Sequence, residues 1–179
     1  MTFRWKISTN SPVYLTELAA TDHTSAAPLL NDRGLCDNML LVPYPYSEAD
    51  FDDFYEITQA ATEQNGQPVN FAIRNETGTM IGGFGVKELT EGHRCEIGYW
   101  LGRPHWGKGI MTHVVRTMTP YVMDQWNLVR VSACTLPTNL ASARVLEKVG
   151  FEYEGLLKKL HKKDDQFIDS RVYSFVRDA

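Results

Sequence analysis

Two glycines flanking a lysine stand between an apolar run and a long amphipathic segment. They are Gly107, Lys108 and Gly109, and they separate residues 95–101 from residues 110–125. The first turn of a helix leaves backbone N–H groups without intrahelical partners and carries the positive end of the helix dipole. Glycines let an anion approach that backbone and allow positive φ. The pattern therefore predicts an anion site, with Lys108 available as a side-chain cation.

The same turn partly matches a P-loop. The match runs from Gly102 through Gly107 and Lys108, and it fails where Gly109 replaces the Ser or Thr whose hydroxyl holds magnesium. A P-loop fold also needs repeated parallel crossovers, and the order of elements in this chain contains one or two. The turn is interpreted as a phosphate cradle, and no metal site is predicted.

One carboxylate lies inside the apolar run. Alternation places Glu96 on the strand face that it shares with Gly98 and Trp100. A carboxylate in such a setting could act as a general base toward an amine. The alternative is a half-solvated carboxylate in a salt bridge with a neighbour such as Arg94 or Arg130. The residues alone leave both interpretations open.

Length and composition restrict the class of protein. The chain has 179 residues, which favours a single domain over residues 1–179 with a sizeable core. A net charge of -4 gives no basic surface for nucleic acid. Three widely spaced cysteines suggest neither a disulfide framework nor a zinc site.

The apolar runs are too short for a membrane span, and the first six residues lack a signal-peptide core. We therefore expect a cytoplasmic protein without membrane or nucleic-acid partners.

Periodicity and turn residues predict an α+β fold with a mixed sheet. A capping box at Ser47 and Asp50 should open one helix. Pro28 should shorten or break another, and Pro120 should kink or divide a third. The expected strands are 13–18, 69–74, 80–89, 94–101, 129–135, 151–160 and 167–177, with the last two joined by a turn at 162–165. The expected helices run from Asp22 or Thr24 to about 33–34, and over 47–66, 110–125 and 139–149.

Several ordered motifs together resemble the GNAT acyltransferase superfamily, and in particular its ribosomal-protein N-terminal acetyltransferase (RimJ/RimL-like) branch. The resemblance extends from about residue 13 to residue 177. One position departs from the family pattern, because Pro104 stands where Gln or Arg is common. The motifs are Val42-Pro-Tyr-Pro-Tyr46, Glu96-Ile-Gly-Tyr-Trp-Leu101, Trp106-Gly-Lys-Gly109, Asn139-x-x-Ser142 and Glu147-Lys-Val-Gly150-Phe151.

This resemblance implies a mostly antiparallel central sheet flanked by helices, with a splayed cleft that holds acetyl-CoA. The pyrophosphate is expected on the backbone amides at the start of the long helix, and the pantetheine arm along the end of the central strand. Asn139 could hydrogen-bond the same arm. The implied cofactor residues are Tyr99, Trp100, Leu101, Gly107, Lys108, Gly109, Ile110, Met111, Thr112 and Asn139.

The resemblance also implies direct acetyl transfer to a primary amine in a ternary complex. Glu96 is the expected base, acting directly or through a water molecule. Ser142 is the expected proton donor to the departing thiolate, unless it only belongs to a helix cap with Asn139. Cys134 could carry the acetyl group in a ping-pong route, although a cysteine in an apolar strand is more often part of the core.

The identity of the acceptor rests on the resemblance alone. A protein or peptide N-terminal α-amine is the first expectation, and a small amine such as a polyamine, amino acid or aminoglycoside is the second. A non-catalytic acyl-CoA-binding module is an alternative of another class. Similar proteins are often dimers, so a homodimer is also expected.

Overall fold

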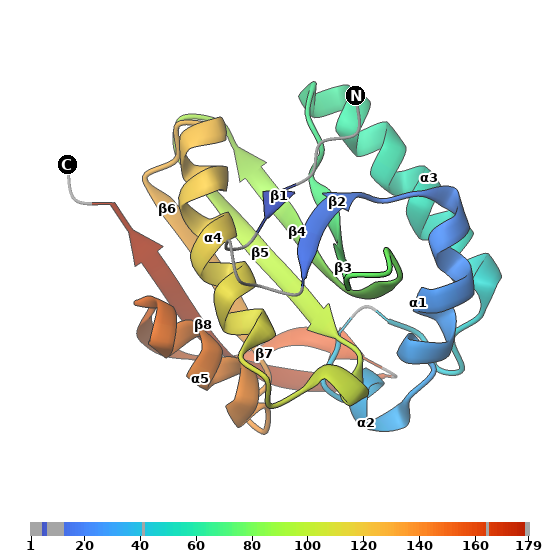
Figure 1. Cartoon of the computed structure of the whole chain (residues 1–179). Coiled ribbons are helices and arrows are strands. Elements are labelled where there is room, and N and C mark those ends of the chain that lie inside the picture. The colour runs from blue at the N-terminus through green and yellow to red at the C-terminus, as the bar shows by residue number, and fades with distance from the viewer. Residues whose placement is uncertain (1–4, 7–12, 41, 164, 178–179) are drawn as a thin grey trace. The chain divides into compact units, whose positions relative to one another are not determined.

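The computed structural model describes residues 5–6, 13–40, 42–163 and 165–177. Strands and helices are mixed along the chain, as predicted (Figure 1). The strands are β1 (Trp5–Lys6), β2 (Tyr14–Glu17), β3 (Asn70–Arg74), β4 (Met80–Thr90), β5 (Arg94–Leu101), β6 (Arg130–Thr135), β7 (Glu152–Lys163) and β8 (Gln166–Val176). The helices are α1 (His23–Leu30), α2 (Arg33–Cys36), α3 (Glu48–Asn65), α4 (Ile110–Gln125) and α5 (Leu140–Val149), with 3-10 turns η1 (Ala20–Asp22) and η2 (Arg103–His105).

The strands form one mixed sheet in the order β1-β2-β3-β4-β5-β6-β8-β7. Antiparallel pairing joins β1 to β2, β2 to β3, β3 to β4, β6 to β8 and β7 to β8. Only β5 and β6 pair in parallel among the described strands, and α4 is the crossover that such a pair requires. These pairings confirm the predicted α+β, mostly antiparallel sheet.

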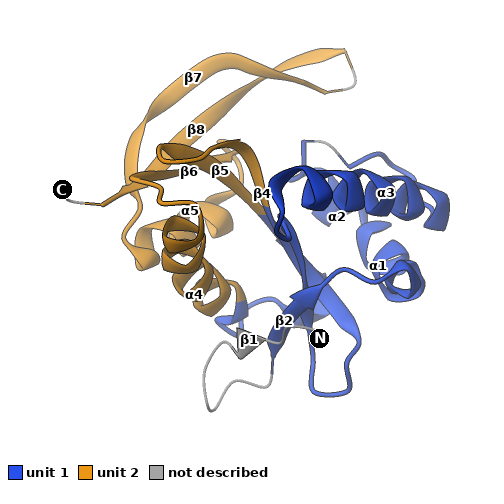
Figure 2. Cartoon of the chain, turned by 90° about the horizontal axis from the view of Figure 1, so that it is seen from above, with its two compact units in different colours: residues 1–85, 99–110 blue, residues 86–98, 111–179 orange. Residues whose placement is uncertain are grey.

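The chain divides into two units, which Figure 2 shows in different colours. The first unit comprises residues 1–85 and 99–110, and the second comprises residues 86–98 and 111–179. Both β4 and β5 contribute residues to each unit. The expectation of a single domain over residues 1–179 stays a prediction.

In the first unit, α3 begins and ends as its sequence predicts. Ser47 Oγ accepts from Asp50 N at 3.3 Å, and Asp50 Oδ2 accepts from Ser47 N at 2.7 Å, which completes the capping box. The helix ends at Gly66 with φ 67°. Phe51 is 1% exposed, whereas Phe54, three residues later on the helix, is 40% exposed. Phe54 therefore covers the edge of the core instead of filling it.

The helix expected to end near residues 33–34 consists of two short helices, α1 and α2. Pro28 lies inside α1, which ends two residues later at Leu30. The carboxylate of Asp32 caps α2 by accepting from Leu35 N at 3.1 Å. The segment is therefore broken after Pro28, as the sequence predicted, and the cap at Asp32, which the sequence analysis did not identify, starts the second helix.

In the second unit, α4 continues through Pro120 to Gln125, so the expected boundary does not form. Val114, Met118 and Val122 are completely buried along its apolar stripe. Burial of that stripe outweighs the backbone hydrogen bond that the proline lacks. Helices α4 and α5 lie side by side, and Arg116 Nη2 donates to the Lys148 carbonyl at 3.0 Å (Figure 1).

The last two strands form a long, curved hairpin (Figure 2). Its register shifts between Tyr153 and Gly155 and again between Leu157 and His161. Such bulges increase the bend and twist of a strand pair. The expected turn at 162–165 lies between β7 and β8, but residue 164 is outside the described residues. No helix in the described part of the chain is long and apolar enough to span a membrane.

Candidate functional site

Glu96 forms a buried ion pair in the second unit. Lys87 Nζ lies 2.8 Å from Glu96 Oε1, and Glu96 as a whole is 8% exposed. The salt bridge of the alternative interpretation is therefore present, and its partner is Lys87 in place of the examples Arg94 and Arg130. Arg130 instead donates through Nη1 to Glu154 Oε1 at 2.7 Å. The lysine reaches Glu96 because β4 is the neighbour of β5 in the sheet.

Cys134 approaches the other oxygen of the same carboxylate. Glu96 pairs with Ser132 across β5 and β6, and Cys134 is two residues further on the same face. Its Sγ donates to Glu96 Oε2 at 3.6 Å. Burial, together with the charge of Glu96, raises the pKa of the Cys134 thiol to about 12. The thiol is therefore protonated near neutral pH, which disfavours a ping-pong route through Cys134.

His161 on β7 is a residue that the sequence analysis did not include in the site. Its Nε2 is buried and makes no hydrogen bond to the described residues. Burial, and secondarily the positive charge of Lys87, lower the pKa of His161, whereas Glu96 and Glu88 act in the opposite direction. The available signal was a single histidine in a strand rich in leucine and lysine, and this signal does not reveal which side chains surround it.

The glycine turn adopts the backbone conformation that its sequence predicted. Gly107 and Gly109 both have φ 73°, in the left-handed region that favours glycine. A Cβ added at Gly107 would meet no heavy atom within 4 Å. Trp106 Nε1 donates to the Leu101 carbonyl at 2.6 Å and ties the turn to the end of β5. The backbone of this turn is therefore fixed in shape and open at Gly107.

Lys108 lies back on its own turn. Its Nζ donates to the Pro104 carbonyl at 3.0 Å, and the residue is exposed. In this orientation, the ammonium group closes the turn, and it would have to rotate to bind an anion. Its role as an anion-binding cation stays a prediction.

The first residues of α4 bury their side chains. Ile110 is 9% exposed and Met111 is 8% exposed, and Thr112 is half-buried. These side chains contribute to the core, so their backbone N–H groups are what a ligand could use. Gly109 has no hydroxyl in the place of the P-loop Ser or Thr, which agrees with our distinction of this glycine turn from a P-loop.

The end of β5 packs closely on two glycines of β4 within the first unit. A Cβ at Gly82 would lie 2.5 Å from the Trp100 carbonyl oxygen, and one at Gly83 would lie 2.6 Å from Trp100 Nε1. Only glycine fits such contacts, so β4 determines where Trp100 lies. Leu101 is buried and Tyr99 is half-buried at the same strand end.

The pairing between β5 and β6, in the second unit, stops before either strand ends. Their described pairs run from Arg94 with Arg130 to Glu96 with Ser132. By contrast, β6 continues to pair with β8 as far as Thr135. A Cβ added at Gly98 would find open space. This arrangement is compatible with the splayed strands that the resemblance implies, and the cleft itself stays a prediction.

Asn139 and Ser142 form a helix cap. Asn139 Oδ1 accepts from Ser142 N at 3.1 Å at the start of α5. This geometry accounts for the spacing of the two residues without any catalytic role. The Ser142 hydroxyl as a proton donor and Asn139 as a pantetheine contact stay predictions.

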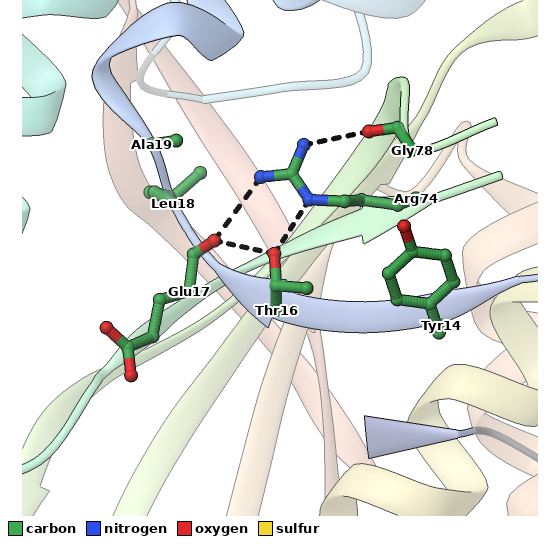
Figure 3. Close-up of a pocket in the computed structure, with 7 residues that line it drawn as sticks. All are labelled: Tyr14, Thr16, Glu17, Leu18, Ala19, Arg74 and Gly78. Atoms are coloured by element: carbon green, nitrogen blue, oxygen red, sulfur yellow. Dashed lines mark hydrogen bonds between the residues drawn. The ribbon is translucent and has the colours of Figure 1, made fainter. Parts of the chain in front are cut away.

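A separate pocket in the first unit is structural. The guanidinium of Arg74 donates to Thr16 Oγ1 at 2.7 Å and to the Gly78 carbonyl at 3.1 Å (Figure 3). It also donates through Nη1 to Asp22 Oδ1 at 2.6 Å. The polar groups of the arginine are thus already paired with the protein. The pocket is lined by Tyr14, Thr16, Glu17, Leu18, Ala19, Arg74 and Gly78.

Comparisons with known proteins assign the chain to a family. The model of a family described as "Acetyltransferase (GNAT) domain" matches residues 13–152. The "Uncharacterized N-acetyltransferase p20" of Bacillus licheniformis is 37% identical over 114 residues, which are 63% of this chain and 64% of that protein. The "[Ribosomal protein uS5]-alanine N-acetyltransferase" of Escherichia coli is 32% identical over 77 residues, 43% of this chain and 40% of that protein.

A solved structure shares the fold over nearly the whole chain. The ribosomal-protein-S5-alanine acetyltransferase from Vibrio fischeri superposes with a TM-score of 0.82 and 21% identity, covering 99% of this chain and 97% of that one. The segments matched in the two curated relatives span less than two thirds of their length. In the described residues, no group of three or more His, Cys, Asp or Glu side chains is placed to hold a metal ion.

Proposed function

Because the chain belongs to the acetyltransferase (GNAT) domain family, as its motifs predicted, we propose that it transfers an acetyl group from acetyl-CoA to a primary amine. The observation that carries this proposal is the buried carboxylate of Glu96, held by Lys87 at 2.8 Å. A buried carboxylate on a strand face is a proton acceptor that such a transfer can use.

The glycine turn supports binding of acetyl-CoA, whose thioester supplies the activated acetyl group. Positive φ at Gly107 and Gly109 directs the backbone into α4, and the space beside Gly107 admits an approaching group. We place the pyrophosphate on the amides of residues 107–112. The pantetheine arm would run along the backbone of residues 99–101, as an added strand pairs with a sheet edge.

The chemistry requires an unprotonated amine. An α-amine has a pKa of about 8, so roughly a tenth of it is free base at pH 7. As the nitrogen attacks the thioester carbonyl, an N–C bond forms, the C–S bond breaks and the nitrogen loses a proton toward Glu96, either directly or through an intervening group. A Cys134 thiol that stays protonated supports direct transfer in a ternary complex over an acetyl-cysteine intermediate.

The proposed acceptor is the α-amine of a protein or peptide N-terminus. The printed name of the Escherichia coli relative, an alanine N-acetyltransferase of ribosomal protein uS5, supports this choice. Small amines are the alternative acceptors. A homodimer and a cytoplasmic location stay predictions.

The test measures coenzyme A release with a panel of matched acceptors. Each peptide would be supplied with a free N-terminus and with a blocked one, keeping any lysine side chain, beside polyamines and aminoglycosides. Mass spectrometry would locate the acetyl group. Turnover confined to the free N-termini is the expected result.

Other outcomes would contradict specific parts of the proposal. Turnover confined to small amines would keep the reaction and replace the acceptor. Binding of acetyl-CoA without turnover on any acceptor would favour a non-catalytic binding module. A Glu96→Gln variant distinguishes an enzyme from a binding module. The substitution should slow acetyl transfer by an enzyme, and it should leave acetyl-CoA binding by a binding module unchanged.

A further inference from the structure

Cross-strand register places His161 on the same sheet face as the Glu96 cluster. His161 lies opposite Ile168, and Cys134 lies opposite Val172 on the same strand, β8. Ile168 and Val172 are four residues apart, so their side chains point to one face of β8. Directly opposed residues also share a face. His161 and Cys134 therefore face the same side, and the contact from Cys134 to Glu96 places that carboxylate there too.

The second register shift in β7 decides which residue of β8 lies opposite His161. Leu157 lies opposite Ser170, and the irregularity lies between Leu157 and His161. His161 is four positions after Leu157 on β7, whereas Ile168 is two positions before Ser170 on β8, so the shift is by two residues and leaves His161 on the same face. The extra residues are accommodated by the bulge. The hairpin curves along its length in Figure 2.

The imidazole of His161 is in a state that can accept a proton. Its buried Nε2 makes no hydrogen bond to the described residues, whereas buried polar atoms in proteins are usually paired. The pKa of His161 is lowered, first by burial and then by Lys87. A neutral imidazole has one acceptor nitrogen. Near pH 7 the ring is therefore uncharged and available as a base.

Glu96 is already engaged at both oxygens. Its Oε1 accepts from Lys87 at 2.8 Å, and its Oε2 accepts from the Cys134 thiol at 3.6 Å. Each oxygen of the carboxylate therefore already has a hydrogen-bond donor. A negative charge held in this position can stabilise a nearby imidazolium.

We propose that His161 is a further catalytic residue, whose Nε2 accepts the proton of the attacking amine while Glu96 stabilises the imidazolium. The N–C bond forms, the C–S bond breaks, and the imidazolium then returns its proton to the coenzyme A thiolate. This role rests on the proposed acetyltransferase function. The charged and titratable groups that act on His161 are Lys87 and Glu88 of β4 and Glu96 of β5, with Cys134 of β6 on the same face.

The placement can be tested without any turnover. Nuclear magnetic resonance of imidazole-labelled protein would follow the five histidines with pH, and loss of one signal in His161→Gln would assign it. We expect a titration below the ordinary histidine range, a lower pKa in Glu96→Gln and a higher pKa in Lys87→Met. A titration that neither variant moves would overturn the placement.

The role is tested by the pH dependence of kcat/KM. We expect His161→Gln to lower kcat roughly 100-fold and to leave the KM for acetyl-CoA unchanged. In the pH profile of kcat/KM, the same variant should lose the step that follows the titration of His161. Free imidazole should partly restore His161→Ala. His93→Gln is the matched control, because His93 is an exposed histidine of the same unit.

The outcomes separate this role from the function on which it rests. A wild-type protein with no turnover on any amine would overturn the acetyltransferase function and the role of His161 together. Turnover that His161→Gln leaves unchanged in rate and pH profile would overturn only the role of His161.

Discussion

Lys87 Nζ and Glu96 Oε1 lie 2.8 Å apart between neighbouring strands, and the glutamate is much more buried than the lysine. The side chain of Lys87 is 41% exposed and that of Glu96 is 11% exposed. A partly exposed cation thus gives a buried carboxylate the partner that a charge inside a protein needs.

Replacing Glu96 by Gln should lower kcat by roughly 100-fold, because the neutral amide cannot accept a proton or stabilise a cation. The measurement is steady-state turnover with a free-amine peptide, beside titration of acetyl-CoA binding. Glu91→Gln, an exposed change on the turn that follows β4, is the control. A Glu96→Gln variant that folds, binds acetyl-CoA and turns over within twofold of wild type would disprove the role of this carboxylate.

Replacing Cys134 by Ala should leave kcat within about threefold of wild type, because a thiol with a pKa near 12 is not a nucleophile at neutral pH. Slow labelling of Cys134 by iodoacetamide at pH 7 would support the same reasoning. The idea of direct transfer would fail if the folded Cys134→Ala variant lost activity, or if acetylated Cys134 accumulated in the absence of an amine.

Gly107→Ala should weaken acetyl-CoA binding about tenfold, which corresponds to about 1.4 kcal/mol. The methyl group meets no atom of the protein, so the cost comes from φ 73° and from the obstructed anion site. Calorimetric titration measures the affinity. Gly92→Ala is a matched control, because Gly92 has the same φ and equally open surroundings. Both variants should lose roughly 1 to 2 kcal/mol of stability. If Gly92→Ala weakened acetyl-CoA binding as much as Gly107→Ala, the anion site at Gly107 would be contradicted.

The Arg130–Glu154 pair should make stability depend on pH in the acid range. Hydrogen bonds from Arg130 and Ser174 lower the pKa of Glu154 from 4.5 to about 2. Since the folded pKa is depressed, the stabilisation is complete above about pH 4.5 and is lost as the pH falls toward 2. Urea unfolding at about pH 5 and about pH 3 should show a smaller loss of stability in Glu154→Gln than in wild type. Glu152→Gln, an exposed change on the same strand, should retain the wild-type loss.

Local signals in the sequence were sufficient for much of the fold. The predicted bounds of β5 and α4 agree with the structure, because glycines and an apolar period define both elements within a few residues of chain. The cap at Ser47 and the positive φ of Gly107 follow from backbone sterics and hydrogen bonding at those positions alone. Such features depend on neighbours along the chain, and the printed sequence contains those neighbours.

The surroundings of Glu96 depend on strands that are distant in sequence. The sequence supplied Glu96 as a candidate base, but the tertiary structure selected Lys87 as its partner over Arg94 and Arg130, because strand order decides which cation is adjacent. The face that His161 occupies depends on the bulge between Tyr153 and Gly155, where β7 has one residue more than β8, because a change in register by a single residue moves a side chain to the opposite face of a sheet. The sequence by itself determined the elements and the chemistry available to them, whereas cross-strand register alone decided which of those groups meet.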